Sequence, residues 1–148
     1  MNDKDLRSRH DDLFDRYHSI ATTKSGTRYE LLAAIVCKTL EDRGVVIHDL
    51  KLLGESGVKH QVGVTVETAS KTRRYLIECK DFDVAADKVG LDIVRSFDSV
   101  VRDTASDEGW IVTCNGFTRD ALEYAKTKRI KPVVMRLFEN GVRAAACR

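Results

Sequence analysis

The stretch Tyr75-Leu-Ile-Glu-Cys-Lys80 combines an apolar strand pattern with two charged side chains. In an extended strand Glu78 and Lys80 point to the same face, about 6–7 Å apart along the chain. A carboxylate can hold Mg²⁺, and a lysine beside it can position or deprotonate a water or stabilise charge on a phosphate. Taken alone, such a triplet is more often a salt bridge on the surface of a strand, so the surrounding sequence decides.

Strand patterns precede and include this stretch. In Gln61–Glu67 valines alternate with mostly polar residues, which is typical of a half-buried strand. The polar segment Thr68–Thr72 predicts a loop, and Arg73–Lys80 predicts the second strand of a hairpin. Val45–Ile47 predicts a short strand before the hairpin, which can continue to Leu53.

Apolar residues at helical spacing predict three helices around these strands. The first begins at a capping box formed by Thr27 and Glu30. The third begins at Thr118 as its N-cap, with Phe117 and Leu122 placed as a hydrophobic staple. The apolar stripes of the first two helices are Tyr29, Leu32, Ala33, Val36 and Leu40, and Val89, Ile93, Phe97 and Val100.

The order of these elements predicts the fold. Trp110–Thr113 and Val133–Phe138 are two further strands, the second entered through Pro132. Helices between the later strands imply parallel pairing there, whereas the hairpin implies antiparallel pairing. We therefore expect one mixed α/β sheet with helices on both faces, formed by residues 26–148. Residues 1–25 are expected to be an accessory N-terminal helical segment.

Composition narrows the classes of protein and partner. The chain has 148 residues, 43% of them hydrophobic and 32% charged, with a net charge of +2. This balance is typical of a globular domain and excludes histone-like bulk electrostatics, so nucleic-acid binding would need a local basic patch. No apolar run approaches the length of a membrane helix, and the N-terminus is too charged for a secretory signal, so we expect a cytoplasmic protein.

Two basic clusters could supply such a patch. The first surrounds the hairpin loop, and the second lies before the last predicted strand. Basic runs are usually solvated faces, but either cluster could contact DNA phosphates. The first cluster consists of Lys71, Arg73 and Arg74, and the second of Lys126, Lys128, Arg129 and Lys131.

The ordered set of motifs resembles the PD-(D/E)xK nuclease superfamily, especially its Mrr-like restriction endonuclease branch, over residues 26–138. The resemblance implies a restriction-endonuclease-like core that hydrolyses DNA phosphodiesters with a divalent metal, Mg²⁺ or Mn²⁺. The motifs that carry it are Gly26-Thr-Arg-Tyr-Glu30, Gly57-Val-Lys-His-Gln-Val-Gly-Val64, Ile77-Glu-Cys-Lys80, Val89-Gly90 and Ile111-Val-Thr-Cys-Asn-Gly-Phe-Thr118.

The resemblance also implies roles for single residues. In the family the metal is held by an Asp on the first hairpin strand, the Glu of Glu-x-Lys and the carbonyl of the intervening residue. The last two are Glu78 and the backbone carbonyl of Cys79 here, and Lys80 matches the catalytic lysine. Glu30 matches an acidic residue on the first helix, although its capping-box role explains it equally well. Gln61 could contact a phosphate or a water, or it could be a solvated strand residue.

The position of the family's Asp is occupied by Gly63, which has no ligand atoms. Three interpretations are open: an inactivating substitution, replacement by another carboxylate such as Glu67 or Glu55, or a hairpin alignment that is wrong by one residue. We favour the first, because Glu67 lies about 13 Å further along the strand. Metal binding should then be weak.

Two hypotheses follow. The leading one is an Mrr-like DNA endonuclease domain that retains Glu78 and Lys80 and that, in the favoured interpretation, is inactivated at Gly63. The alternative is a non-catalytic DNA- or protein-binding module with a nuclease-like fold. No helix-turn-helix or zinc-finger pattern supplies sequence readout, so target choice would depend on a homodimer or a partner subunit.

Overall fold

The computed structural model describes residues 29–31, 33–34, 44–68, 73–82, 86–138 and 141–146. The expected accessory segment at 1–25 lies outside the described residues. So do Thr27, Leu32, Val36 and Leu40 of the first expected helix, and Lys71 of the first basic cluster.

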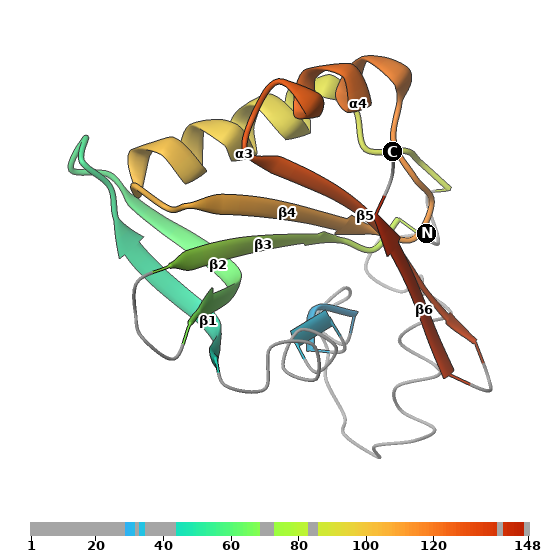
Figure 1. Cartoon of the computed structure of the whole chain (residues 1–148), viewed down its shortest axis with the longest axis horizontal. Coiled ribbons are helices and arrows are strands. Elements are labelled where there is room, and N and C mark those ends of the chain that lie inside the picture. The colour runs from blue at the N-terminus through green and yellow to red at the C-terminus, as the bar shows by residue number, and fades with distance from the viewer. Residues whose placement is uncertain are drawn as a thin grey trace, which may run out of the picture.

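A six-stranded mixed sheet forms the centre of the fold, with its strands in sequence order (Figure 1). Pairing is antiparallel between β1 and β2, β2 and β3, and β5 and β6, and parallel between β3 and β4 and between β4 and β5. This confirms the expected mixed sheet. The strands are β1 (Val45–Leu53), β2 (Lys59–Glu67), β3 (Arg74–Lys80), β4 (Glu108–Thr113), β5 (Ile130–Phe138) and β6 (Gly141–Ala146).

Helices cover both faces of the sheet, as expected. Helices α3 (Leu91–Asp103) and α4 (Arg119–Lys126) lie on one face, and the helical residues 29–31 and 33–34 lie on the other (Figure 1). The Tyr29 hydroxyl donates a 2.9 Å hydrogen bond to the carbonyl of Met135 on β5. Burial raises the pKa of this phenol, so the hydroxyl remains a donor.

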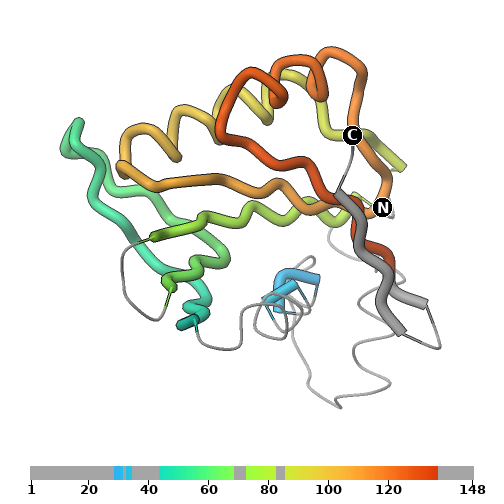
Figure 2. The backbone as a smooth tube through the Cα atoms, viewed as in Figure 1, coloured from blue at the N-terminus to red at the C-terminus, as the bar shows by residue number. Residues whose placement is uncertain are grey.

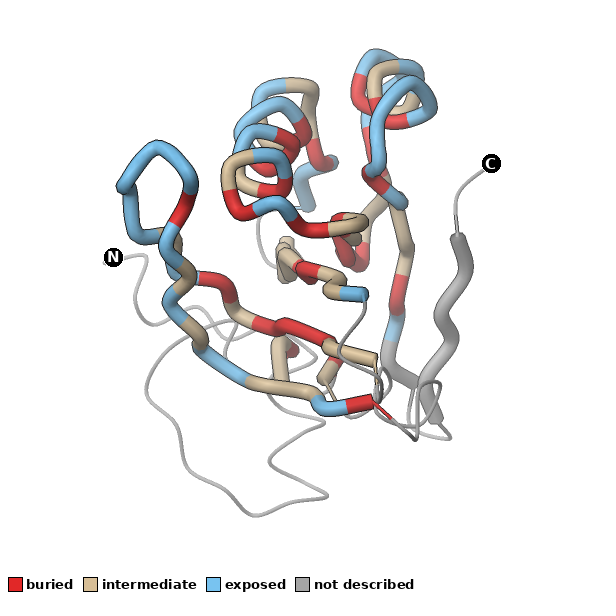
Figure 3. Tube along the Cα trace, turned by 60° about the vertical axis from the view of Figure 1, so that its left-hand side comes forward, coloured by how far each residue is buried: buried red, intermediate tan, exposed pale blue. Residues whose placement is uncertain are grey.

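The core accordingly has two layers, one on each side of the sheet. Buried residues follow the central strands and the sides of α3 and α4 that face them, whereas the tip of the β1–β2 hairpin is largely exposed (Figure 3). The layer under α3 and α4 includes Val62, Leu76, Val94, Phe97, Val101 and Ile111. The opposite layer includes Tyr29, Ala33, Val64, Val66, Ile77, Val112 and Met135.

Several helix and strand boundaries follow from local chemistry. The Thr118 side chain accepts a 3.3 Å hydrogen bond from the backbone N–H of Ala121, which confirms the expected N-cap of α4. Val89, expected in a helix, instead forms an isolated bridge to Phe117, because α3 begins only after Gly90. Pro132, expected to precede the last strand, lies within β5. It is tolerated there because the β5–β6 ladder begins only at Val133.

Strand β6 was not expected from the sequence. Its residues, Gly141-Val-Arg-Ala-Ala-Ala146, include one β-branched residue and no aromatic residue, so they favour a strand only weakly. Pairing with β5 places it at the edge of the sheet.

Candidate functional site

The β1–β2 hairpin reverses its two faces halfway along its length, at Asp49 and Gly63. These two residues are not paired in the ladder between the strands, and Asp49 adopts a left-handed φ of 59°. On one side of this point Val64 packs in the core layer of Tyr29, and on the other side Val62 packs in the layer of α3. Alternate residues of a regular strand share a face, so the expected alternation of the valines is broken at Gly63.

Strand β2 separates from β3 at the same place. The β2–β3 ladder ends with the pair Val64 and Ile77, one residue short of Gly63 and Glu78. Beyond this pair the hairpin rises toward α3 rather than following β3 (Figure 2). The separation leaves the side chains of Glu78 and Lys80 30% and 32% exposed.

The tip of the hairpin is fastened to the C-terminal end of α3 through Asp103. Its carboxylate accepts hydrogen bonds from the backbone N–H and hydroxyl of Ser56, at 2.9 and 2.6 Å, and lies 2.6 Å from Nε2 of His60. The bonds from Ser56, and next those from His60, hold the pKa of Asp103 at about 2. A β-carbon on Gly54 would stand 1.9 Å from this carboxylate, so only glycine permits the approach.

Glu78 and Lys80 form an ion pair with a distance of 2.9 Å between Oε1 and Nζ. They share one face of β3, as strand geometry predicted. They line a hollow of about 230 Å³ against α3, together with Asp92 and Ser96. The sequence reasoning did not single out these two α3 residues. The sequence feature that could have indicated them is their position on the polar side of the predicted helix, beside its apolar stripe.

The carboxylate of Glu30 fills the space beside Gly63. A β-carbon on Gly63 would lie 2.6 Å from the carboxyl carbon of Glu30. The same carboxylate lies 2.8 Å from Nε2 of His48 on β1. Residue 63 is therefore in contact with a carboxylate that another element supplies.

The Mrr catalytic-domain family, described as a restriction endonuclease, matches residues 26–138. The chain belongs to this restriction endonuclease family. Family members generally use divalent metal ions and act on DNA.

One solved structure, titled a protein of unknown function, AF1548, shares the fold. It is 23% identical, with a TM-score of 0.59, and the match covers 70% of this chain and 56% of that one. The matched part of this chain thus spans little more than half the length of that protein. No curated protein matches the chain.

The remaining family-derived positions are placed as follows. Gln61 is exposed, and its side-chain amide donates to the carboxylate of Asp49 on β1. The Cys79 side chain packs in the layer of Tyr29, on the face opposite Glu78. Of the two alternative carboxylates, Glu67 pairs with Arg74 at 3.4 Å, at the far end of the β2–β3 ladder.

The other alternative carboxylate, Glu55, lies at the hairpin tip. Its backbone N–H donates a 2.7 Å hydrogen bond to the carbonyl of Asp103.

The donor set of a restriction endonuclease metal site is incomplete here. Among the described residues, no three His, Cys, Asp or Glu side chains are grouped so that they could hold a metal ion. Glu78 is paired with Lys80, Glu30 with His48, and Gly63 offers no side-chain ligand atom. Hard divalent cations take about six oxygen ligands, usually including carboxylates. The side chains as arranged do not fit such a site.

Thr113 adds a polar group that sequence reasoning missed. It lies directly opposite Lys80 in the parallel β3–β4 ladder. Its hydroxyl is buried and has no hydrogen-bond partner within the described part of the chain. An unpartnered buried hydroxyl costs free energy, so its place beside Lys80 is notable.

The first basic cluster is divided in the structure. The Arg73 guanidinium lies 5.6 Å from the ring centre of Tyr75, whereas Arg74 is occupied by its ion pair with Glu67.

No helix among the described residues is long and apolar enough to cross a bilayer.

Proposed function

We propose that the chain is a DNA-binding nuclease domain in which Glu78 and Lys80 face the phosphodiester and hydrolysis is impaired at Gly63. The observation that carries this proposal is the position of the 2.9 Å Glu78–Lys80 pair, in a hollow between β3 and α3 just beyond the last β2–β3 pair. An ammonium group in such a hollow supplies positive charge to a phosphate.

The incomplete donor set is the reason to expect impaired hydrolysis. A bound divalent metal would polarise the phosphate and lower the pKa of a bound water. With Glu78 and the Cys79 carbonyl as the remaining family-derived donors, we expect weak binding of Mg²⁺ or Mn²⁺. Titration calorimetry tests this, and tight binding that survives Glu78→Ala would contradict the assignment.

A non-catalytic DNA- or protein-binding module is the second candidate. It is favoured by the absence, among the described residues, of three metal-ligating side chains in one group. Nuclease activity and DNA affinity together separate the two candidates.

The decisive experiment restores the missing carboxylate while clearing its space. In Gly63→Asp alone, the new side chain would meet the Glu30 carboxylate, which lies 2.6 Å from the β-carbon position. Gly63→Asp/Glu30→Ala removes both this overlap and the repulsion between the two carboxylates, and Glu30→Ala alone is the control. We expect metal-dependent nicking of plasmid DNA to increase in the double variant and to disappear again when Lys80→Ala is added.

Two outcomes would contradict the proposal. If the unmodified chain cleaves as fast as the double variant, position 63 is not the vacant ligand position. If neither cleaves and the unmodified chain fails to bind DNA at low salt, the chain is a protein-binding module.

A further inference from the structure

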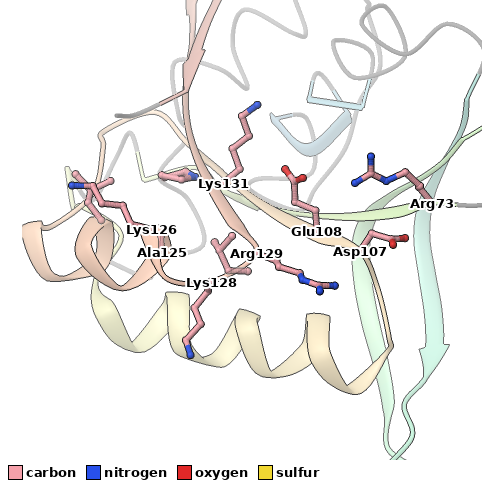
Figure 4. Close-up of a pocket in the computed structure, with 11 residues that line it drawn as sticks. Arg73, Asp107, Glu108, Ala125, Lys126, Lys128, Arg129 and Lys131 are labelled. Carbon is pink, nitrogen blue, oxygen red and sulfur yellow. The ribbon is translucent and has the colours of Figure 1, made fainter.

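A second hollow lies at the opposite end of the strands from the Glu78–Lys80 pair. Its volume is about 620 Å³, and it is bounded by the starts of β4 and β5, the end of α4 and the residue before β3 (Figure 4). Tertiary structure thus brings members of both basic clusters to one concave surface. Its cationic lining residues are Arg73, Lys126, Lys128, Arg129 and Lys131.

The hollow keeps a net positive charge, because five cations and two carboxylates line it. Of the five cations, only Lys126 has a carboxylate within 4 Å among the described residues, that of Glu123 at 3.2 Å. The two acidic lining residues hydrogen-bond elsewhere: Asp107 accepts from the Arg74 backbone N–H at 2.7 Å. Glu108 accepts from the Trp110 indole at 2.6 Å.

Aromatic rings hold three of the cations in place without cancelling their charge. Arg73 lies 5.6 Å from the ring centre of Tyr75, Lys128 lies 5.3 Å from that of Tyr124, and Lys131 lies 5.0 Å from that of Trp110. Cation–π contacts restrict these side chains but leave their N–H groups available. Preorganised, exposed cations with free donors suit phosphate groups.

The hollow is distinct from the Glu78–Lys80 site. Arg73 precedes Glu78 by five residues along an extended strand, a separation of about 17 Å. Neighbouring base pairs of a duplex are 3.4 Å apart along the axis, so this distance corresponds to about five base pairs.

We propose that the hollow binds backbone phosphates of DNA at a second site, remote from the phosphodiester that faces Lys80. This inference rests on the proposed function, because it takes DNA as the ligand. The contacts go to phosphates, so the site should hold DNA independently of its sequence.

The test compares two double variants that remove the same charge from exposed positions. Arg129→Ala/Lys131→Ala changes the hollow, and Lys51→Ala/Lys59→Ala changes the β1–β2 hairpin. Affinity for a labelled 20-base-pair duplex is measured by fluorescence anisotropy over a salt series, after circular dichroism has verified folding. Log affinity falls with log salt, and we expect the hollow variant to reduce the magnitude of this slope by about two. We expect the hairpin variant to leave the slope unchanged.

The remaining outcomes are separable. An unchanged slope in the hollow variant, or an equal loss in the hairpin variant, would overturn this inference alone. Absence of duplex binding by the unmodified chain at low salt would overturn the proposed function as well. Competition by inorganic phosphate at the same phosphate concentration as the DNA would assign the hollow to free phosphate and overturn DNA as its ligand.

Discussion

The carboxylate of Glu30 stands where a side chain on residue 63 would begin. The 2.6 Å distance from its carboxyl carbon to the β-carbon position makes these two residues mutually dependent. Glycine at 63 leaves room for Glu30, and Glu30 in turn contacts His48 at 2.8 Å. A helix on one face of the sheet therefore supplies an acidic group at a point where β2 itself has none.

This relationship predicts coupling between the two positions. Replacing a strand glycine by alanine ordinarily stabilises by about 0.5–1 kcal/mol, because glycine loses more backbone entropy on folding. We expect that gain for Gly63→Ala only in a Glu30→Ala background, since in the native background the new methyl group displaces the Glu30 carboxylate. Urea unfolding of the four proteins measures the coupling, which should be at least about 0.5 kcal/mol. Equal effects in both backgrounds would show that the two side chains do not share this space.

The buried hydroxyl of Thr113 predicts an unusual gain in stability. Because it has no hydrogen-bond partner among the described residues, Thr113→Val should raise the free energy of unfolding by about 1 kcal/mol. Thr104→Val is the matched control. The Thr104 hydroxyl donates to the carbonyl of Val100 at 2.8 Å, so its removal should lower that free energy by a similar amount. A loss in both variants would mean that Thr113 has a hydrogen-bond partner in solution.

The sequence predicted the β2–β3 hairpin and the pairing directions well, because half-buried strands alternate and the intervening helices impose parallel pairing. It did not predict the reversal of faces at Gly63. That reversal accompanies the contact of the β1–β2 hairpin tip with Asp103, which is 47 residues from Ser56 in sequence. No local sequence pattern indicates such a contact. Strand β6 was missed because its alanines carry little strand preference, and its pairing with β5 defines it.

Charge at the Glu78–Lys80 pair should control DNA affinity. Glu78→Gln removes a negative charge close to the expected phosphate and leaves Lys80 without its ionic partner. One charge at about 6 Å in water is worth about 0.7 kcal/mol, so duplex DNA should bind about threefold more tightly. Anisotropy titration at low salt measures this change, with Asp120→Asn on α4 as a control of equal charge. An equal gain in DNA affinity in the control would show that the effect of Glu78→Gln comes from net charge alone.

The fastening of the hairpin should be lost in acid. The pKa of Asp103 is about 2 in the folded chain, below its ordinary value of 3.8, because Ser56 and His60 hydrogen-bond its charged form. The stability that it contributes is therefore complete above 3.8 and is lost as the pH falls through about 2. The unfolding midpoints of the native protein and Asp103→Asn should differ from pH 6 to 4 and converge toward pH 2. A constant difference would show that the charge of Asp103 does not hold the hairpin.

The candidate site was only partly visible in the sequence. Glu78 and Lys80 could be paired because residues two apart in a strand share a face. Contact between Glu30 and Gly63 depends on how a helix crosses the sheet, and a sequence pattern does not fix that. The two basic clusters could also be recognised in the sequence. Only the spatial order of β3, β4 and β5 brings their residues to one hollow.

Two supports hold the β1–β2 hairpin in place: its base pairs with β3, and its tip hydrogen-bonds to Asp103. Its middle, around Gly63, is not paired with β3, so we expect the distance between the two supports to set the width of the gap beside Glu78. Lengthening or shortening the turn at residues 54–58 would move one support and change that width without altering any residue that faces the gap. Under the proposed function, we expect changes at the tip to alter which duplex geometry the gap admits.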